Sequence, residues 1–276
     1  MMKKNVMILI GTALLLSSCA GEFNKVLKSN DYDYRYEFAK QCFAEGKYNQ
    51  AESLLREMIT LKKGTDDAQE SLYMLAMSEY MNGDYDSASE TFKKYYTTYP
   101  KGFYSEVAMY YVGQSLFSSA PEPRLDQTAT LGAISAFQQF LDIYPQSSLR
   151  PVAQDRLFDL QDKLVQKEFL SAQLYYNLGG YFGNINSNSE SNYSSCIIVA
   201  QNALKNYPFM KHREDFMLLI MKSKFQLAEN SSDERRVERY RDAEDECYGF
   251  INEYPESKNV ELAQKYINKC KKYTKD

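Results

Sequence analysis

The residues that could take part in catalysis are few and scattered along this chain of 276 residues. His212 is the only histidine, so a histidine metal site or a serine–histidine–aspartate triad has one candidate and no recognisable partners. The motifs G-x-x-x-x-G-K-[ST], G-x-G-x-x-G and H-E-x-x-H do not occur in the sequence. Carboxylates are scattered over polar stretches, which is typical of solvated helix surfaces. We therefore expect no enzymatic activity, no metal and no cofactor, and binding becomes the chemistry to explain.

Five cysteines could carry a different chemistry: Cys19, Cys42, Cys196, Cys247 and Cys270. The last four are too widely spaced for a typical zinc site. Cys196 and Cys247 fall at small or apolar positions of a helical repeat, which favours buried thiols that behave as small hydrophobic side chains. Their disulfide pairing cannot be deduced from sequence and stays open.

Cys19 ends a segment with the pattern of a secretory leader. Lys3 and Lys4 precede an apolar run from Val6 to Leu16, which is shorter than the roughly 20 residues that span a bilayer. The Leu-Ser-Ser-Cys that follows resembles a bacterial lipobox. We expect residues 1–18 to be a signal peptide and Cys19 to be lipidated, with several acyl chains giving a stable anchor. An ordinary signal peptide with an incidental cysteine is the alternative.

The residues after Cys19 indicate in which membrane the protein would be anchored. We expect residues 19–30 to form a lipidated tether. Ala20-Gly21 lacks the aspartate that retains similar lipoproteins at the inner membrane, and no acidic cluster suggests export to the cell surface. The expected location is the periplasmic face of the outer membrane, where the protein is anchored by lipid.

The stretch from Leu72 to Pro100 predicts a helical hairpin. Apolar residues recur at helical spacing on both sides of a turn at Asn82-Gly83-Asp84. The second helix must end near Tyr99, because proline disfavours helix at the residue before it. Ala76 and Ala88 supply small side chains where the two helices approach. The pattern is close to the 34-residue tetratricopeptide repeat.

The same frame fits the chain five times. In four copies a small residue lies twelve positions before the proline of a Tyr-Pro pair: Ala88 and Pro100, Ala133 and Pro145, Cys196 and Pro208, Ala243 and Pro255. The first copy, led by Ala51, has Lys63-Gly64 instead. A fixed offset through variable linkers predicts an all-α tetratricopeptide superhelix of about five hairpins.

One long helix is expected to join two groups of repeats. Residues 148–178 contain no glycine and a single proline, Pro151, which suits the first turn of a helix. Gly179-Gly180 would end it. We expect repeats 1–3 at residues 31–147, and the joining helix, repeats 4–5 and a capping helix at residues 148–276.

Aromatic side chains are the feature that best suits binding. The chain has 24 tyrosines, 15 phenylalanines and no tryptophan, and its net charge of −4 argues against a nucleic-acid partner. The first helix of a tetratricopeptide hairpin presents one stripe of residues to the inner groove. Counting from the small residue of hairpins 1–3 selects seven groove candidates: Tyr36, Phe43, Tyr73, Met77, Tyr80, Tyr110 and Phe117. Such a row suits an extended peptide with apolar or aromatic side chains, although any of these residues could instead be inter-helix core.

The stretch DKLVQKEFLSAQLYY at residues 162–176 adds a more specific signal. Together with the lipobox and the repeats, it resembles the BamD family, in which a similar D-[RK]-L-A-x-x-E-[FY]-x-x-A-x-[FY]-Y segment precedes a glycine-containing turn. The resemblance covers Cys19 to about Tyr254. It implies a non-enzymatic subunit of the outer-membrane β-barrel assembly machinery. Its C-terminal repeats would bind the POTRA domains of BamA, and its N-terminal repeats would receive the C-terminal signal of unfolded outer-membrane proteins.

Two other binding functions stay open. The repeats would also fit another periplasmic tetratricopeptide lipoprotein that acts as a cell-envelope adaptor. A glycan-binding lipoprotein of the nutrient-uptake kind is a further alternative, and the absence of tryptophan counts against it.

Overall fold

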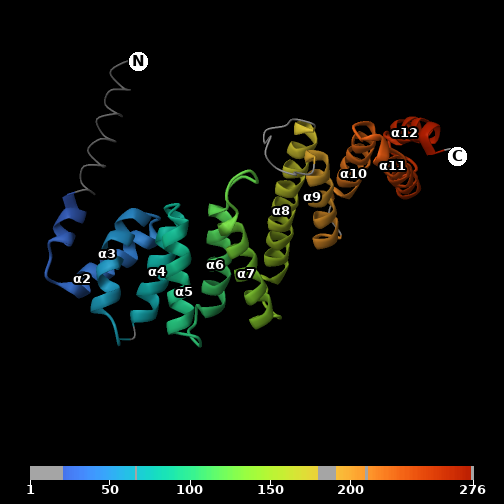
Figure 1. The fold of residues 1–276 in the computed structure, drawn as a ribbon. Coiled ribbons are helices and arrows are strands. Elements are labelled where there is room, and N and C mark those ends of the chain that lie inside the picture. The colour runs from blue at the N-terminus through green and yellow to red at the C-terminus, as the bar shows by residue number, and fades with distance from the viewer. Residues whose placement is uncertain (1–20, 66, 180–190, 209–210, 275–276) are drawn as a thin grey trace, which may run out of the picture. The chain divides into compact units, whose positions relative to one another are not determined.

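The computed structural model describes residues 21–65, 67–179, 191–208 and 211–274, and these ranges contain helices and no strand (Figure 1). This confirms the all-α prediction. The signal peptide and Cys19 lie outside the described residues. The main helices are α2 (Tyr32–Ala44), α3 (Tyr48–Leu61), α4 (Asp67–Met81), α5 (Tyr85–Thr98), α6 (Ser105–Ser119), α7 (Thr128–Ile143), α8 (Arg150–Leu178), α9 (Asn192–Asn206), α10 (Arg213–Glu229), α11 (Asp233–Glu253) and α12 (Val260–Thr274).

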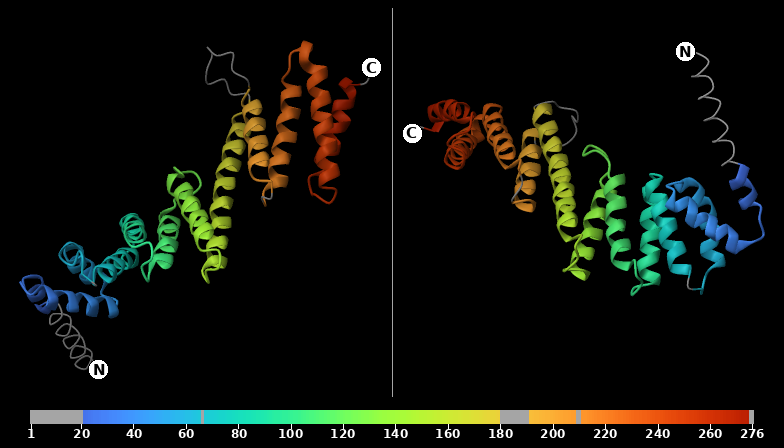
Figure 2. Two further views of the ribbon diagram at one scale, coloured as in Figure 1. Left: turned by 90° about the horizontal axis from the view of Figure 1, so that it is seen from below. Right: turned by 180° about the vertical axis from the view of Figure 1, so that it is seen from behind.

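The chain forms two compact units. The first comprises the residues up to Pro121 and Thr128–Leu157, and the second comprises Glu122–Gln127 and Phe158–Asp276. Within the first unit, each helix from α2 to α7 packs against the next, and α9 to α12 do so within the second (Figure 2). The division falls inside α8, whereas the sequence analysis places it between residues 147 and 148.

The small residue predicted for each hairpin is fully buried. Ala51, Ala88, Ala133, Cys196 and Ala243 are all 0% exposed. The residues four positions later are also 0% exposed: Leu55, Phe92, Phe137, Ala200 and Cys247. The residue seven positions after the small one is the third buried position of this helix, and the residue at the eighth position is only half-buried. At 100° per residue, the seventh position lies about 20° from the small residue and the eighth about 80° away, so the seventh faces the same core.

The Tyr-Pro pairs end their helices as predicted. The backbone N–H of Tyr99 donates to the carbonyl of Tyr95 at 2.8 Å, and the N–H of Tyr254 donates to Phe250 at 2.9 Å. Three residues after the tyrosine, a serine returns to the first helix of the same hairpin in two of the repeats. Ser147 donates to Glu106 at 2.5 Å, and Ser257 donates to Glu214 at 2.6 Å.

The joining helix is close to its prediction. α8 spans 29 residues from Arg150 to Leu178, with Pro151 in its first turn. Gly179 follows with φ of 49°, a left-handed conformation that glycine adopts without a steric penalty. The C-terminal capping helix is also present as α12.

The segment expected as a tether is instead partly helical. Residues 21–27 form a short helix, Val26 is 0% exposed, and Phe23 packs against the core formed by α2, α3 and α4. The spacing of Phe23, Val26 and Leu27 is that of one apolar helix face. The free tether is therefore shorter than residues 19–30.

The four described cysteines are buried, as the sequence analysis prefers. Burial raises the pKa of the Cys196 thiol. Burial likewise raises the pKa of Cys247 to about 12 and of Cys270 to about 11. These thiols therefore stay protonated at neutral pH and act as small apolar side chains.

Candidate partner-binding surface

Three of the predicted groove residues lie on one face of α4. Tyr73, Met77 and Tyr80 are spaced four and three positions apart, and all are half-buried against the core of α4, α5 and α6. Tyr73 stacks on Tyr104 with ring centroids 4.1 Å apart and planes at 9°. Tyr80 meets Tyr111 edge-on at 5.1 Å. Burial raises the pKa of Tyr73 to about 12, so its hydroxyl stays neutral.

A continuous series of ring contacts joins these residues to the following helices. Adjacent pairs have centroids 5.2 to 6.1 Å apart along the series Tyr99, Tyr95, Tyr73, Phe92, Tyr111, Tyr110, Phe140 and Tyr144. Most are edge-on or tilted, the geometries that aromatic quadrupoles favour. Tyr73 and Tyr110 therefore belong to one network, which is first of all the packing between hairpins.

Tyr36 and Tyr110 are too buried to contact a partner in this conformation. Tyr36 is 1% exposed, and its hydroxyl donates to Glu70 at 3.0 Å. Tyr110 is 7% exposed, and its ring lies 5.8 Å from Phe137 and 5.7 Å from Phe140. These two residues belong to the core between helices, which is the alternative that the sequence analysis kept open.

Phe43 and Phe117 are half-buried at separate places in the first unit. Phe43 belongs to the core of α2 and α3 and meets Tyr48 edge-on at 5.7 Å. Phe117 lies beneath the guanidinium of Arg156, which is 4.6 Å from the ring centroid and forms a cation–π contact. The seven candidates are thus not one uniform row, and the three residues of α4 form the most coherent group.

Phe103 is an exposed ring that the sequence analysis missed. It is 88% exposed and meets Tyr104 edge-on at 4.9 Å, so it continues the stack that begins at Tyr73. Gly102 holds this turn, because a Cβ there would lie 2.7 Å from the Gln69 Oε1 and 2.8 Å from the Tyr95 hydroxyl. The sequence signal that could have identified this ring is Gly102-Phe103-Tyr104, which comes shortly after the Tyr99-Pro100 pair. We name Tyr73, Met77, Tyr80, Phe103 and Tyr104 the aromatic surface.

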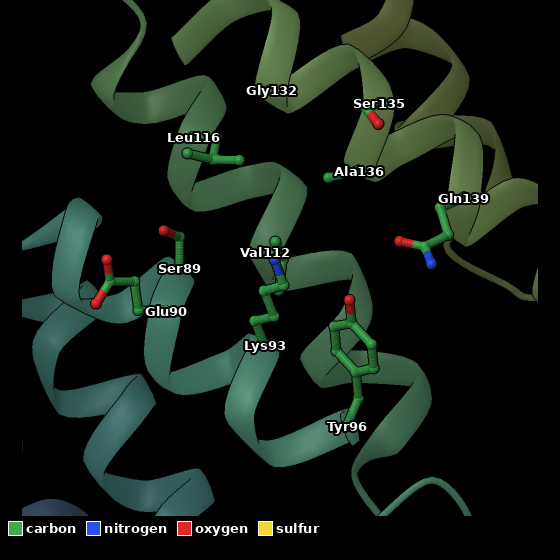
Figure 3. A pocket seen from close by; sticks show the side chains of 10 residues that line it. All are labelled: Ser89, Glu90, Lys93, Tyr96, Val112, Leu116, Gly132, Ser135, Ala136 and Gln139. Carbon is green, nitrogen blue, oxygen red and sulfur yellow. The ribbon is translucent and has the colours of Figure 1, made fainter. Parts of the chain in front are cut away.

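A separate hollow lies between α5, α6 and α7 (Figure 3). Its volume is about 470 Å³, and Val112, Leu116 and Ala136 are among its lining residues. Glu90 and Lys93 from α5 and Gln139 from α7 also line it. None of the seven predicted groove residues lines this hollow, so a counting rule based on the first helix of each hairpin could not find it.

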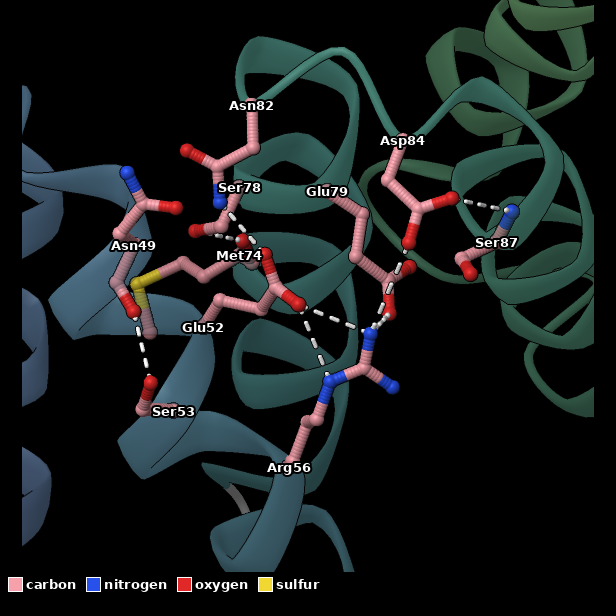
Figure 4. A network of polar contacts seen from close by, with 10 residues as sticks. All are labelled: Asn49, Glu52, Ser53, Arg56, Met74, Ser78, Glu79, Asn82, Asp84 and Ser87. Atoms are coloured by element: carbon pink, nitrogen blue, oxygen red, sulfur yellow. Dashed lines mark hydrogen bonds and ion pairs between the residues drawn. The ribbon is translucent and has the colours of Figure 1, made fainter.

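A polar network fixes the first hairpin to the second (Figure 4). Arg56 of α3 lies 2.8 Å from Glu52, 3.0 Å from Glu79 of α4 and 4.0 Å from Asp84 in the α4–α5 turn. Glu79 is 1% exposed, and burial raises its pKa although Thr91 and Arg56 favour the charged form. The network fixes the position of α4, and with it the aromatic surface.

The segment at residues 162–176 lies in α8 and builds the core of the second unit. Val165 and Ala172 are buried against α9 and α10. Phe169 stacks on His212 with centroids 5.7 Å apart and meets Phe216 edge-on. The most distinctive stretch of the sequence is therefore mainly structural, which explains why its aromatic positions recur at helical spacing.

The described residues contain no cluster of three or more metal-ligating side chains. His212 immediately precedes α10, and its Nδ1 lies 3.0 Å from the Asp215 carboxylate. No helix in the described ranges combines the length and the apolar character needed to cross a bilayer.

Comparison with known proteins agrees with these features. The family model YfiO, described as an outer membrane lipoprotein, matches residues 29–190, more than half of the chain. The outer membrane protein assembly factor BamD of Caulobacter vibrioides is 22% identical over 170 residues, which are 60% of this chain and 56% of that protein. The match thus spans little more than half of that relative's length. The extent of the family match shows that this chain belongs to the YfiO family of outer membrane lipoproteins.

Proposed function

We propose that this protein is a lipid-anchored, non-enzymatic component of the machinery that inserts β-barrel proteins into the outer membrane. The family match over residues 29–190 carries the proposal. The second unit would bind POTRA domains of a BamA-like barrel protein. The first unit would receive the C-terminal segment of an unfolded barrel. Acylated Cys19 would hold both at the periplasmic face of the outer membrane.

The aromatic surface supports a role in binding unfolded chains. Phe103 is largely exposed, Tyr104 and Tyr73 support it by stacking, and Met77 and Tyr80 extend the same face of α4. Rings held by neighbouring rings lose little entropy when a guest binds. An extended segment with aromatic or aliphatic side chains would cover the apolar edges that the repeat leaves in contact with water.

Peptide binding tests the client site. In the protein carrying Met77→Ala, Tyr80→Ala and Phe103→Ala, we expect affinity for a fluorescent peptide with the C-terminal sequence of an outer-membrane barrel to fall at least about tenfold, the range of a lost hot spot. Tyr248→Ala is the matched control, because Tyr248 is a 45% exposed ring in the second unit. Equal affinity of the triple variant and the wild type would show that the aromatic surface does not bind this segment.

Membrane fractionation tests the anchor. The Cys19→Ala variant should remain folded and move from the membrane pellet to the soluble periplasmic fraction, because the acyl chains would be lost. Continued pelleting in cells depleted of the BamA-like protein would argue against a lipid anchor. Affinity purification of wild type should recover that barrel protein, and its absence would favour the alternative of a different cell-envelope adaptor.

A further inference from the structure

The loop between α6 and α7 has a defined internal structure. Gln127 is 3% exposed, and its side-chain amide donates to the carbonyl of Glu122 at 2.8 Å and to that of Leu125 at 3.0 Å. The N–H of Leu125 also donates to the Glu122 carbonyl at 3.0 Å. These bonds replace the backbone partners that a helix would provide. The loop is therefore an ordered part of the second unit.

This loop and one face of α8 enclose a hollow of about 420 Å³. Leu170, Leu174 and Pro123 supply its apolar surface, with Ser171, Gln173 and Asn177 beside them, and Arg124 and Lys167 complete it. Leu174 is 58% exposed, although it lies in the middle of a long helix whose other face is buried. The apolar residues of this face do not contribute to the core of the second unit described above, which uses Val165, Phe169 and Ala172.

The charge of this hollow has one sign. Arg124 and Lys167 form no ion pair with any described residue, and no carboxylate is among the lining residues. Glu122 and Asp126 belong to the same loop but do not line the hollow. In the same unit Lys224, by contrast, pairs with Glu246 at 2.6 Å. Two uncompensated cations next to the exposed Leu174 and the half-buried Leu170 favour an occupant that is both anionic and aliphatic.

We propose that the hollow formed by the loop Glu122–Gln127 and α8 binds an acidic, aliphatic segment of a partner protein. A carboxylate of that segment would lie between Arg124 and Lys167, and its aliphatic side chain would pack on Leu170 and Leu174. The ordered loop lowers the entropic cost of binding, because Arg124 is presented by a closed turn. This site uses other residues than the aromatic surface, so it does not depend on the client site proposed above.

Photo-crosslinking in cells tests the occupant. A benzophenone amino acid replaces Leu174 in the full chain, and Ile198, a 50% exposed aliphatic residue of α9, is the matched control position. We expect position 174 to crosslink to a protein segment that mass spectrometry shows to contain aspartate or glutamate beside aliphatic residues, and position 198 not to crosslink to it. A crosslink to lipid, to a second copy of this chain or to a segment without acidic residues would overturn the proposal, and so would no crosslink.

Charge reversal tests the contact itself. Arg124→Glu with Lys167→Glu should reduce the crosslink yield at position 174 at least tenfold, whereas Arg124→Lys with Lys167→Arg should largely retain it. The thermal unfolding midpoint of each variant checks the fold, and the synthetic form of the crosslinked segment provides a second measurement. Its affinity for wild type should fall at least tenfold when its acidic residues are replaced by amides. An unchanged yield or affinity would refute the charge pairing.

Discussion

The hairpins of the two units share one pattern of buried positions, but the larger side chain of a facing pair lies on opposite helices in the two units. In the second and third hairpins, which belong to the first unit, the position four residues after the small one holds a phenylalanine, and Phe137 faces Gly113 so closely that a Cβ at Gly113 would lie 2.8 Å from the ring. In the second unit the corresponding Cys247 is small, and Met221 of α10 shares its core. The repeat pattern therefore constrains the combined volume of the two facing side chains, as close packing requires. It leaves open which helix carries the larger of the two.

This difference bears on where rings become available for binding. Large aromatic residues on α5 and α7 meet further aromatic residues on α4 and α6, and the resulting network has edges that reach the surface. In the second unit two pairs of rings stack on each other instead, Phe225 on Tyr266 at 3.8 Å and Tyr240 on Tyr273 at 4.3 Å. The proposed guest segment would then contact side chains of the first unit that also pack its hairpins together.

Removing a large core ring should have the largest effect. Phe92→Ala should lower the free energy of unfolding by about 3–5 kcal/mol, the usual cost of a cavity of this size. Phe250→Ala provides the matched change in the second unit, because both residues are 0% exposed. Chemical denaturation followed by circular dichroism measures both. If Phe92→Ala cost less than about 1 kcal/mol, the ring network of the first unit would not be a packed core.

Filling the space at Gly113 should have the next largest effect. Gly113→Ala should destabilise the protein by about 1–3 kcal/mol, because the ring of Phe137 must move. Adding Phe137→Leu should recover part of this loss in a double-mutant cycle. Gly249→Ala is the control, since a Cβ there meets no atom within 4 Å. Additive effects of Gly113→Ala and Phe137→Leu would show that these two positions do not compete for the same space.

The serine contacts should show where the units are alike. Ser147→Ala and Ser257→Ala should each cost about 1 kcal/mol, because each removes a hydrogen bond between the end of a hairpin and its first helix. Denaturation midpoints of the two variants and of Ser53→Ala, whose exposed hydroxyl bonds only within its own helix, give the comparison. A clear loss in only one of the two units would show that the contact is not a common part of the repeat.

Two glutamates should give the units opposite responses to pH. Burial raises the pKa of Glu79 above its ordinary value of 4.5. The contribution of Glu79 to the free energy of unfolding is therefore fully present below pH 4.5 and is lost as pH rises through its folded-state pKa. Glu229 is different: burial opposes charge, but hydrogen bonds from Lys269 and Tyr240 outweigh it and lower the pKa. Its contribution is present above 4.5 and is lost as pH falls through its folded-state pKa.

Amide substitutions separate these two contributions. Glu79→Gln should raise the free energy of unfolding at neutral pH and remove the loss of stability on raising pH, because the amide carries no charge to bury. Glu229→Gln should lower stability at neutral pH, and this effect should shrink as pH falls through the folded-state pKa of Glu229. Thermal midpoints between pH 3 and pH 8 measure both. The same direction of change at neutral pH for both variants would mean that one of these environments is wrongly described.

Sequence reasoning succeeded where a position is fixed by local geometry. The small residues Ala88 and Cys196, the ends at Tyr-Pro and the extent of α8 all follow from helix periodicity and from the restrictions that proline and glycine impose. It also misassigned one short segment. Residues 21–27 are helical because Phe23 and Val26 pack against the core of α2, α3 and α4.

The candidate sites were harder to predict because they depend on contacts between hairpins. The register of α4 correctly places Tyr73, Met77 and Tyr80 together, but it could not show that Tyr36 and Tyr110 are buried by residues of neighbouring helices. Phe103 and the hollow beside α8 lie where a loop meets a helix. Their composition resembles that of ordinary turns, so only the folded chain reveals them.

The buried thiols have a consequence for biogenesis. In the folded protein the described cysteines are inaccessible and the pKa values of Cys247 and Cys270 are high, so they would resist oxidation. A chain exported to the periplasm, as proposed above, would lack this protection until it folds. Each helical pair closes through contacts near in sequence, which form fast. The yield of molecules with reduced cysteines would then depend on whether the hairpins fold faster than the cell's oxidants react with exposed thiols.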